Sequence, residues 1–199
     1  MRSRPPSGIV EHSGIREGHS TYTLLPGAAR HPVFGRVYNT LRESTPAGTM
    51  ISRASAREAI ESGGARGHYA LKEGKITGAA TSISIPLGGR TSQLHIGYLT
   101  PGSRPASEAL IQAAVRAHNQ QNGAGSARFL TAEAGNQREA QHLENLGFRF
   151  LGTHQQGEVE GLQARAVSVW ARGMRTNKPL GNSGVRQTLL NQVRQALYG

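Results

Sequence analysis

The stretch of sequence that decides the fold begins LHIGYLTPGSRPASEALIQAAV at residues 94–115 and continues to position 148. Its first six residues are an apolar run typical of a buried β-strand. The turn at 100–107, which contains Pro and Gly, leads into a segment with helical periodicity. The first N–H groups of a helix lack intrahelical partners and can hold an anion. The turn is therefore a candidate seat for a phosphate group.

Two helices and a strand are predicted beyond the turn. The helix over residues 107–119 places Leu110, Ile111, Ala114 and Val115 on one face. A short strand follows at 127–132, and a second helix at 136–146 is ended by Gly147 in the C′ position. The order strand, turn, helix, strand, helix indicates an α/β domain.

This order resembles the GNAT superfamily of acyl-CoA N-acyltransferases. The family's phosphate-binding motif, Gln/Arg-x-x-Gly-x-Gly/Ala, is similar to RPASEA at residues 104–109, and its later helix, which runs from an Asn to a Gly-Phe pair, is similar to residues 136–148. The resemblance covers about residues 22–172. It implies an α/β (α+β) fold with a mixed, mostly antiparallel central sheet flanked by helices.

The resemblance also implies that acetyl-CoA is the cofactor and that the turn supplies N–H groups to its diphosphate. The implied cofactor-binding residues are Leu99, Thr100, Arg104, Ala106, Ser107, Ala109 and Asn136. Two positions depart from the family motif, because Ser107 replaces its Gly and Pro105 deletes one N–H donor. The alternative role for Ser107 and Asn136 is to cap the helices that follow them.

Amine acetylation needs a base for the ammonium, a donor to the thioester carbonyl and an acid for the departing thiolate. The candidate bases are His95 and Glu133; the alternatives are a hydrogen-bonded strand histidine and an ion pair with a nearby arginine. The family's usual acid is a Tyr five residues before the Phe of the Gly-Phe pair, and here that position is Leu143. Tyr98, His142 or water would have to substitute. On a helix His142 is rotated about 100° from Leu143, which argues against it.

Composition bounds the other kinds of chemistry. The 199-residue chain has neither Cys nor Asp, and no cluster with metal-ligand spacing, so no disulfide and no metal site is expected. The net charge of +11 favours an anionic partner. Because there is no apolar run of about 18 residues and no signal-peptide pattern, we expect a soluble protein that is cytoplasmic or associated with an assembly, with secretion by a signal-independent route left open.

Three regions are expected along the chain: a flexible arm at 1–20, the acyltransferase-like domain at 21–174, and a linker with an amphipathic helix at 175–199. Within the domain we predict a strand at 22–25, helices at 32–43 and 53–61, a hairpin over 67–85, and last strands at 149–154 and 163–172. The terminal helix has an apolar stripe over 185–197. This stripe either docks on the domain or binds a partner protein or second subunit.

Two functional hypotheses of different classes follow. The first is a divergent acetyl-CoA-dependent N-acetyltransferase that acts on an amine. The alternative is a catalytically inactive GNAT-like binding or structural component of a larger assembly, such as a virion or secreted effector. Nucleic-acid binding is less well supported, since the few aromatic residues are not interleaved with Arg in a stacking pattern.

Overall fold

The computed structural model describes residues 7–16, 18–45, 50–86, 92–124, 126–156, 165–173 and 183–198. The strands are β1 (Ile9–Arg16), β2 (His19–Leu24), β3 (Arg66–Lys72), β4 (Lys75–Pro86), β5 (Ser92–Leu99), β6 (Ala127–Ala134), β7 (Arg149–Gln156) and β8 (Arg165–Gly173). The helices are α1 (Pro32–Ser44), α2 (Arg53–Glu61), α3 (Arg104–Asn122), α4 (Gln137–Asn145) and α5 (Ser183–Tyr198), with a short 3-10 helix at Pro26–Ala28.

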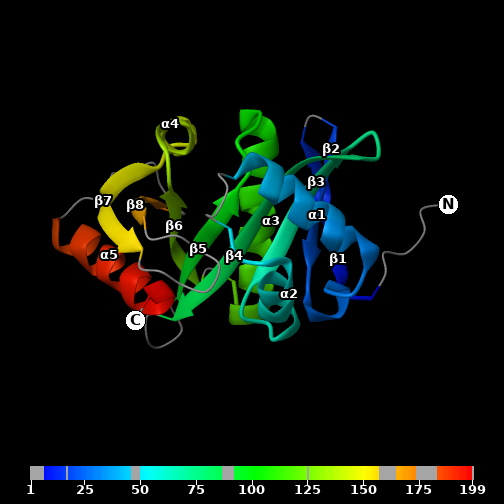
Figure 1. Cartoon of the computed structure of the whole chain (residues 1–199), viewed down its shortest axis with the longest axis horizontal. Helices are drawn as coiled ribbons and strands as arrows, with labels where there is room; N and C mark the ends of the chain where they lie inside the picture. Colours follow the sequence, from blue (N-terminus) through cyan, green and yellow to red (C-terminus); the bar gives the residue numbers. More distant parts are fainter. Residues whose placement is uncertain are drawn as a thin grey trace.

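All of these strands join one sheet in the order β1-β2-β3-β4-β5-β6-β8-β7 (Figure 1). Every neighbouring pair is antiparallel except β5 and β6, which run parallel. A parallel pair needs a crossover, and α3 provides it. The predicted fold, a mixed and mostly antiparallel sheet flanked by helices, is confirmed.

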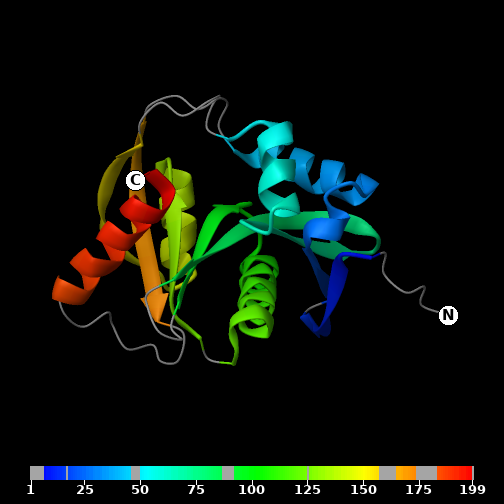
Figure 2. The ribbon, with the colours of Figure 1, turned by 90° about the horizontal axis from the view of Figure 1, so that it is seen from below.

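Helices cover both faces of the sheet. On one face α3 and α4 bury a cluster that includes Leu94, Ile111, Leu130 and Leu143. On the other face α1 and α2 cover the β1–β4 end, and α5 covers β7 and β8. Figure 2 shows α3 on the opposite side of the strands from α1 and α2. Strand β5, in the middle of the sheet, contributes Leu99 to the cluster under α3 and α4 and Tyr98 to the cluster under α1 and α2.

Local sequence signals explain where α4 begins and ends. The Asn136 side chain caps its start by accepting a hydrogen bond from the Glu139 N–H (2.9 Å). At the other end Gly147 has φ +82°, and the N–H groups of Gly147 and Phe148 bond to the carbonyls of Glu144 and Leu143. This is a Schellman motif, and the buried Phe148 belongs to the same hydrophobic cluster as Leu143, whose carbonyl accepts its N–H.

The prediction for α3 is wrong at its start. The helix begins at Arg104 rather than at 107, because Ser103 is the N-cap and Pro105 fits the first turn, where its missing N–H costs nothing. The Ser103 hydroxyl accepts from the Ala106 N–H (3.4 Å), and the Ser107 N–H bonds to the Ser103 carbonyl (3.1 Å). Ser107 is therefore inside the helix and is not its cap.

The expectation of a flexible arm at 1–20 is also wrong over most of its length. Residues 9–16 form β1, which pairs with β2, and β2 itself begins at His19. Ile9 packs into the core below α1 and α2, and the buried His12 bonds to Thr23. Pairing with β2 supplies the backbone hydrogen bonds that the local composition did not suggest. Residues 1–6 lie outside the described part of the chain.

The terminal helix packs on the chain's own sheet. Leu189, Leu190 and Val193 are buried against β4, β7 and β8, whereas Val185 is exposed. Docking on the chain's own domain, one of the two alternatives for the apolar stripe, therefore accounts for these three side chains. The expected linker at 175–182 lies outside the described residues.

Candidate functional site

The parallel strands β5 and β6 separate near their carboxyl ends. Their pairing runs from Ser92 opposite Ala127 to Ile96 opposite Ala132 and then stops. Beyond this point Leu99 pairs with Ala80 on β4, and β6 remains paired with β8. A slot therefore opens between the two strands from Gly97 onward.

A β-bulge in β5 shapes this slot. Ser82 lies opposite Ile96 and Ala80 opposite Leu99, so Gly97 and Tyr98 together face the single residue Thr81. The Thr81 hydroxyl accepts the Tyr98 N–H (3.0 Å). Regular alternation from Ile96 would direct Tyr98 toward α3, but Tyr98 packs against the α1 and α2 cluster instead. The bulge thus brings Tyr98 to the other face of the sheet.

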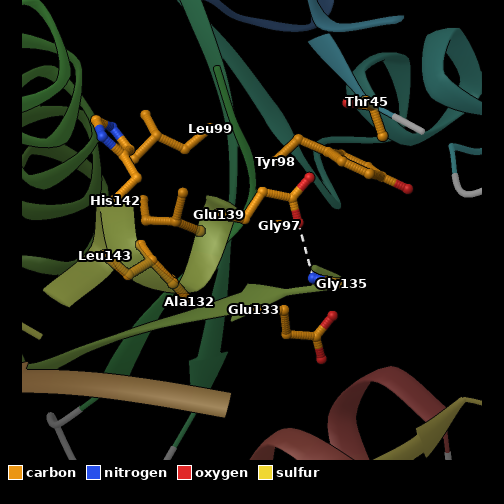
Figure 3. A pocket seen from close by; sticks show the side chains of 11 residues that line it. Thr45, Gly97, Tyr98, Leu99, Ala132, Glu133, Gly135, Glu139, His142 and Leu143 are labelled. Carbon is orange, nitrogen blue, oxygen red and sulfur yellow. Dashed lines mark hydrogen bonds between the residues drawn. The ribbon is translucent and has the colours of Figure 1, made fainter. Parts of the chain in front are cut away.

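The slot passes through the sheet and has different walls on the two faces. Leu99, Ala132, His142 and Leu143 line it on the α3 and α4 side, whereas Tyr98, Glu133 and Thr45 line it on the α1 side. Figure 3 shows the Tyr98 side chain directed toward Thr45 and away from His142. The enclosed part is narrow, about 30 Å³, which is room for about one water molecule.

The turn between β5 and α3 is anchored at one end and open at the other. Thr100 bonds twice to Ala79, through its own N–H (2.9 Å) and through its hydroxyl (3.0 Å). Gly102, Ser103 and Arg104 are exposed, and no described residue accepts a hydrogen bond from their backbone N–H groups. These three donors lie at the positive end of a 19-residue helix. These three N–H groups form a candidate anion seat, which lies within the turn at 100–107 that the sequence predicted.

Four of the predicted cofactor-binding residues lie in α3, and three of them lie beyond its first residue. The N–H groups of Ala106 and Ser107 are already bonded to Ser103, and Ala109 lies beyond the first turn, where amides bond within the helix. Arg104, in contrast, is exposed at the seat. Of the predicted phosphate-binding turn at 104–109, only the N–H of Arg104 is therefore left without a partner among the described residues.

Ser107 and His142 connect the two helices beside the slot. The Ser107 hydroxyl and His142 Nε2 are 2.9 Å apart, and Ser107 is almost fully buried. Burial, followed by the charge of Arg138, lowers the pKa of His142 below its ordinary value. The imidazole is therefore neutral at neutral pH. Both His142 and Leu143 line the slot, so rotation about the helix did not exclude His142 from it.

A larger, open groove continues from the slot along α4. It has a volume of about 880 Å³ and is lined by Pro101, Gly102, Asn136, Arg138 and His142, among others. The Asn136 side chain caps α4, which is the alternative role that the sequence analysis gave it, and Asn136 also borders the groove. His142 is the residue that the slot and the groove share.

The candidate bases have different surroundings. Glu133 lines the slot and is half-buried. His95 is fully buried behind the slot, where its Nδ1 is bonded to the Thr131 hydroxyl (3.0 Å), and burial lowers its pKa to about 4. Its Nε2 has no hydrogen-bond partner within the described part of the chain. Of the three predicted catalytic residues, the structure brings Tyr98 and Glu133 together at the slot and leaves His95 outside its lining.

One residue that sequence reasoning did not single out holds the walls in place. Arg172 on β8 makes two hydrogen bonds to the Glu108 carboxylate on α3 (2.9 and 3.1 Å) and one to the Leu146 carbonyl at the end of α4 (2.7 Å). Its guanidinium also lies 5.2 Å from the centre of the Phe148 ring. Sequence spacing gave no signal, because these residues are 26 and 64 positions apart.

Two other kinds of feature are absent from the described residues. No group of three or more His or Glu side chains within them is arranged to hold a metal ion. None of the described helices combines the length and apolar character needed to cross a lipid bilayer.

No protein-family model matches the chain, and no curated protein sequence is significantly similar to it. Solved structures, in contrast, share its fold. The apo RimL ribosomal L7/L12 alpha-N-protein acetyltransferase matches with a TM-score of 0.59 and 14% identity, covering 87% of this chain and 99% of that one. RimL in complex with coenzyme A matches with a TM-score of 0.55 and 15% identity, covering 81% and 97%.

The ribosomal-protein-S5-alanine acetyltransferase from Vibrio fischeri is similar to the same degree. Its TM-score is 0.55 at 15% identity, and the match covers 85% of this chain and all of that one. At such low identity the likeness is one of fold. The chain has the GNAT fold, as the sequence resemblance predicted.

Proposed function

We propose that this GNAT-fold chain is an acetyl-CoA-dependent N-acetyltransferase that acts on an amine. The observation that carries the proposal is the separation of β5 and β6 at Gly97 directly beside the open helix start at Gly102, Ser103 and Arg104. The anion seat would hold the diphosphate of a nucleotide thioester on one face of the sheet. The slot would let an amine acceptor reach the thioester from the other face.

The donors present fit such a cofactor. Backbone N–H groups at a helix start suit a diphosphate, and Arg104 adds a positive charge. The 880 Å³ groove offers room for the remaining nucleotide portion, and the slot leads the thioester toward Tyr98 and Glu133. Since the slot is only about 30 Å³ in volume, the Leu99 and His142 side chains must shift to admit the thioester arm.

The residues of the slot have complementary roles in acetyl transfer. Glu133, on the α1 side, takes a proton from the incoming ammonium, so that the amine nitrogen can attack the thioester carbonyl carbon. The C–N bond forms as the C–S bond breaks. Tyr98 or a water molecule then protonates the departing thiolate, and the Ser107 hydroxyl holds the neutral His142 imidazole beside the slot.

Calorimetric titration with acetyl-CoA tests the anion seat. We expect micromolar binding that weakens at least about tenfold in Arg104→Glu, because the reversed charge repels the diphosphate. The variant itself should stay folded, since an acidic residue is favourable in the first turn of a helix. Arg36→Glu is the matched control: Arg36 is exposed on α1, on the opposite face of the sheet, and its reversal should leave binding unchanged.

A shortened ligand separates the seat from the slot. S-acetylpantetheine carries the thioester arm but no diphosphate, so its binding should be equal in the parent protein and in Arg104→Glu. No binding of acetyl-CoA at millimolar concentration would refute the proposal and favour the non-catalytic assembly component.

Thiol release in the presence of an amine panel tests the chemistry. N-terminal peptides and agmatine are suitable acceptors, because the fold neighbours include enzymes acting on a ribosomal protein N-terminus and on agmatine. Glu133→Gln should lower the rate at least about 100-fold while acetyl-CoA binding stays the same. An unchanged rate would exclude Glu133 as the base.

A further inference from the structure

A second cavity lies at the far end of α3 from the proposed anion seat. It has a volume of about 330 Å³ and lies between the last turns of α3 and strands β1 to β3. Val10, Leu25, Pro26 and Ala117 supply apolar walls, and Arg66 is the charged residue that lines it. Because α3 has 19 residues, the two ends are about 28 Å apart. We call this cavity the Arg66 pocket.

Arg66 lines the pocket with no counter-ion among the described residues. The residue is 8% exposed, and no hydrogen bond or ion pair connects its guanidinium to any described residue. Burial lowers the pKa of Arg66, and no carboxylate offsets this effect. Removing a guanidinium from water without a partner is costly, and a buried arginine is ordinarily paired.

The polar residues that continue inward from Thr23, which lines the pocket, offer no negative charge either. A hydrogen-bonded row runs from His12 through Thr23 and His68 to Ser82, with contacts of 2.7, 2.9 and 2.7 Å. Burial is the main cause that lowers the pKa of both histidines, in His68 to about 3, so the row is neutral at pH 7. The side chains of this row bond to one another, and none of them pairs with the guanidinium.

We propose that the Arg66 pocket binds a small organic carboxylate with an apolar body, the carboxylate pairing with the Arg66 guanidinium. A single planar guanidinium matches one carboxylate through two parallel hydrogen bonds. The mainly apolar walls suit a hydrocarbon body, and the volume is at the lower end of small-molecule sites, about 300–1,000 Å³. Inorganic phosphate lacks the body that these walls would cover.

Isothermal titration with sodium octanoate tests this proposal, with octanamide as the uncharged analogue and inorganic phosphate as the anion without a body. We expect octanoate to bind the parent protein, and to bind at least about tenfold more weakly in Arg66→Gln. Octanamide and phosphate should each bind at least about tenfold more weakly than octanoate. Arg149→Gln is the matched control, because Arg149 is exposed on β7 near the other edge of the sheet.

Two further variants keep the test decisive. Ala117→Leu fills the pocket and retains Arg66, so it should abolish octanoate binding even if Arg66→Gln does not fold. Arg66→Met should raise the melting temperature of the ligand-free protein, since it replaces an unpaired buried cation with an apolar side chain. A lower melting temperature would assign Arg66 a structural role and overturn the proposal.

The other outcomes are equally clear. No octanoate binding at millimolar concentration, equal binding by Arg66→Gln, or equal binding of octanamide or phosphate would each overturn the proposal. Acetyl-CoA binding should be unchanged in all of these variants, so failure of this site is distinguishable from failure of the proposed acetyltransferase.

Discussion

Replacement of Arg172 by Met should strongly destabilise the fold. Arg172 and Glu108 have side-chain exposures of 19% and 18%, and Arg172 also bonds to the Leu146 carbonyl. Met preserves much of the packing but leaves a mostly buried carboxylate and a carbonyl without their donor. Breaking a fully buried pair costs about 3–5 kcal/mol and an exposed pair about 0–1 kcal/mol, so at this exposure we expect a loss of about 2–4 kcal/mol.

Urea denaturation followed by circular dichroism measures this loss. In a chain of this size it corresponds to a melting temperature lower by about 4–16 °C. Glu108→Gln in the Arg172→Met background should recover at least about 1 kcal/mol relative to additivity, because it removes the orphaned charge. Arg30→Met breaks a pair with Glu61 whose arginine is 87% exposed, and it should cost less than about 1 kcal/mol. Equal losses in the two arginine variants, or strict additivity in the double variant, would refute the reasoning.

Three further predictions concern other parts of the fold. The free energy of unfolding should fall by about 2 kcal/mol for each of His68 and His95 between pH 7 and pH 5. Their folded-state pKa values, about 3 and about 4, lie below the unfolded value of about 6.5, so protons bind preferentially to the unfolded chain as the pH falls. Urea denaturation at a series of pH values measures this slope, and its absence would contradict the prediction. Gly97→Ala should cost about 1–2 kcal/mol in the same assay, because its Cβ would lie 3.0 Å from the Thr81 hydroxyl that holds the bulge, and Thr81→Ala should abolish most of this extra cost. Leu190→Ala should cost about 2–4 kcal/mol, because Leu190 is buried on the face of α5 that packs against the sheet, and a loss under 1 kcal/mol would mean that α5 does not hold to the sheet in solution.

Much of the fold could be predicted because its elements carry strong local signals. The helix with Pro32 in its first turn and the helix from 53 to 61 were predicted to within a residue, as was the end of α4 at Gly147. Each has a cap or a stop residue beside a regular apolar stripe. Strand β1 was missed because its stability comes from pairing with β2, which is a property of the tertiary structure.

The candidate site was predicted less well, because its geometry depends on small displacements. The turn was identified, but the start of the helix moved from residue 107 to residue 104, because Ser103 rather than Ser107 caps α3. Tyr98 was selected by type, yet the face on which it lies follows from a bulge that alternation cannot reveal. His142 was set aside from helical rotation, although the position of α4 brings it to the slot.

The bulge in β5 has a consequence for how this chain can vary. Deleting Gly97 would remove the bulge and place Tyr98 directly after Ile96, so that regular alternation alone would keep Tyr98 on the α1 side and Leu99 opposite Ala80. Deleting a residue between Gln93 and Ile96 would instead shift part of the strand by one position and reverse the faces of its side chains. Tolerance to single-residue deletions along β5 should therefore be greatest at the bulge.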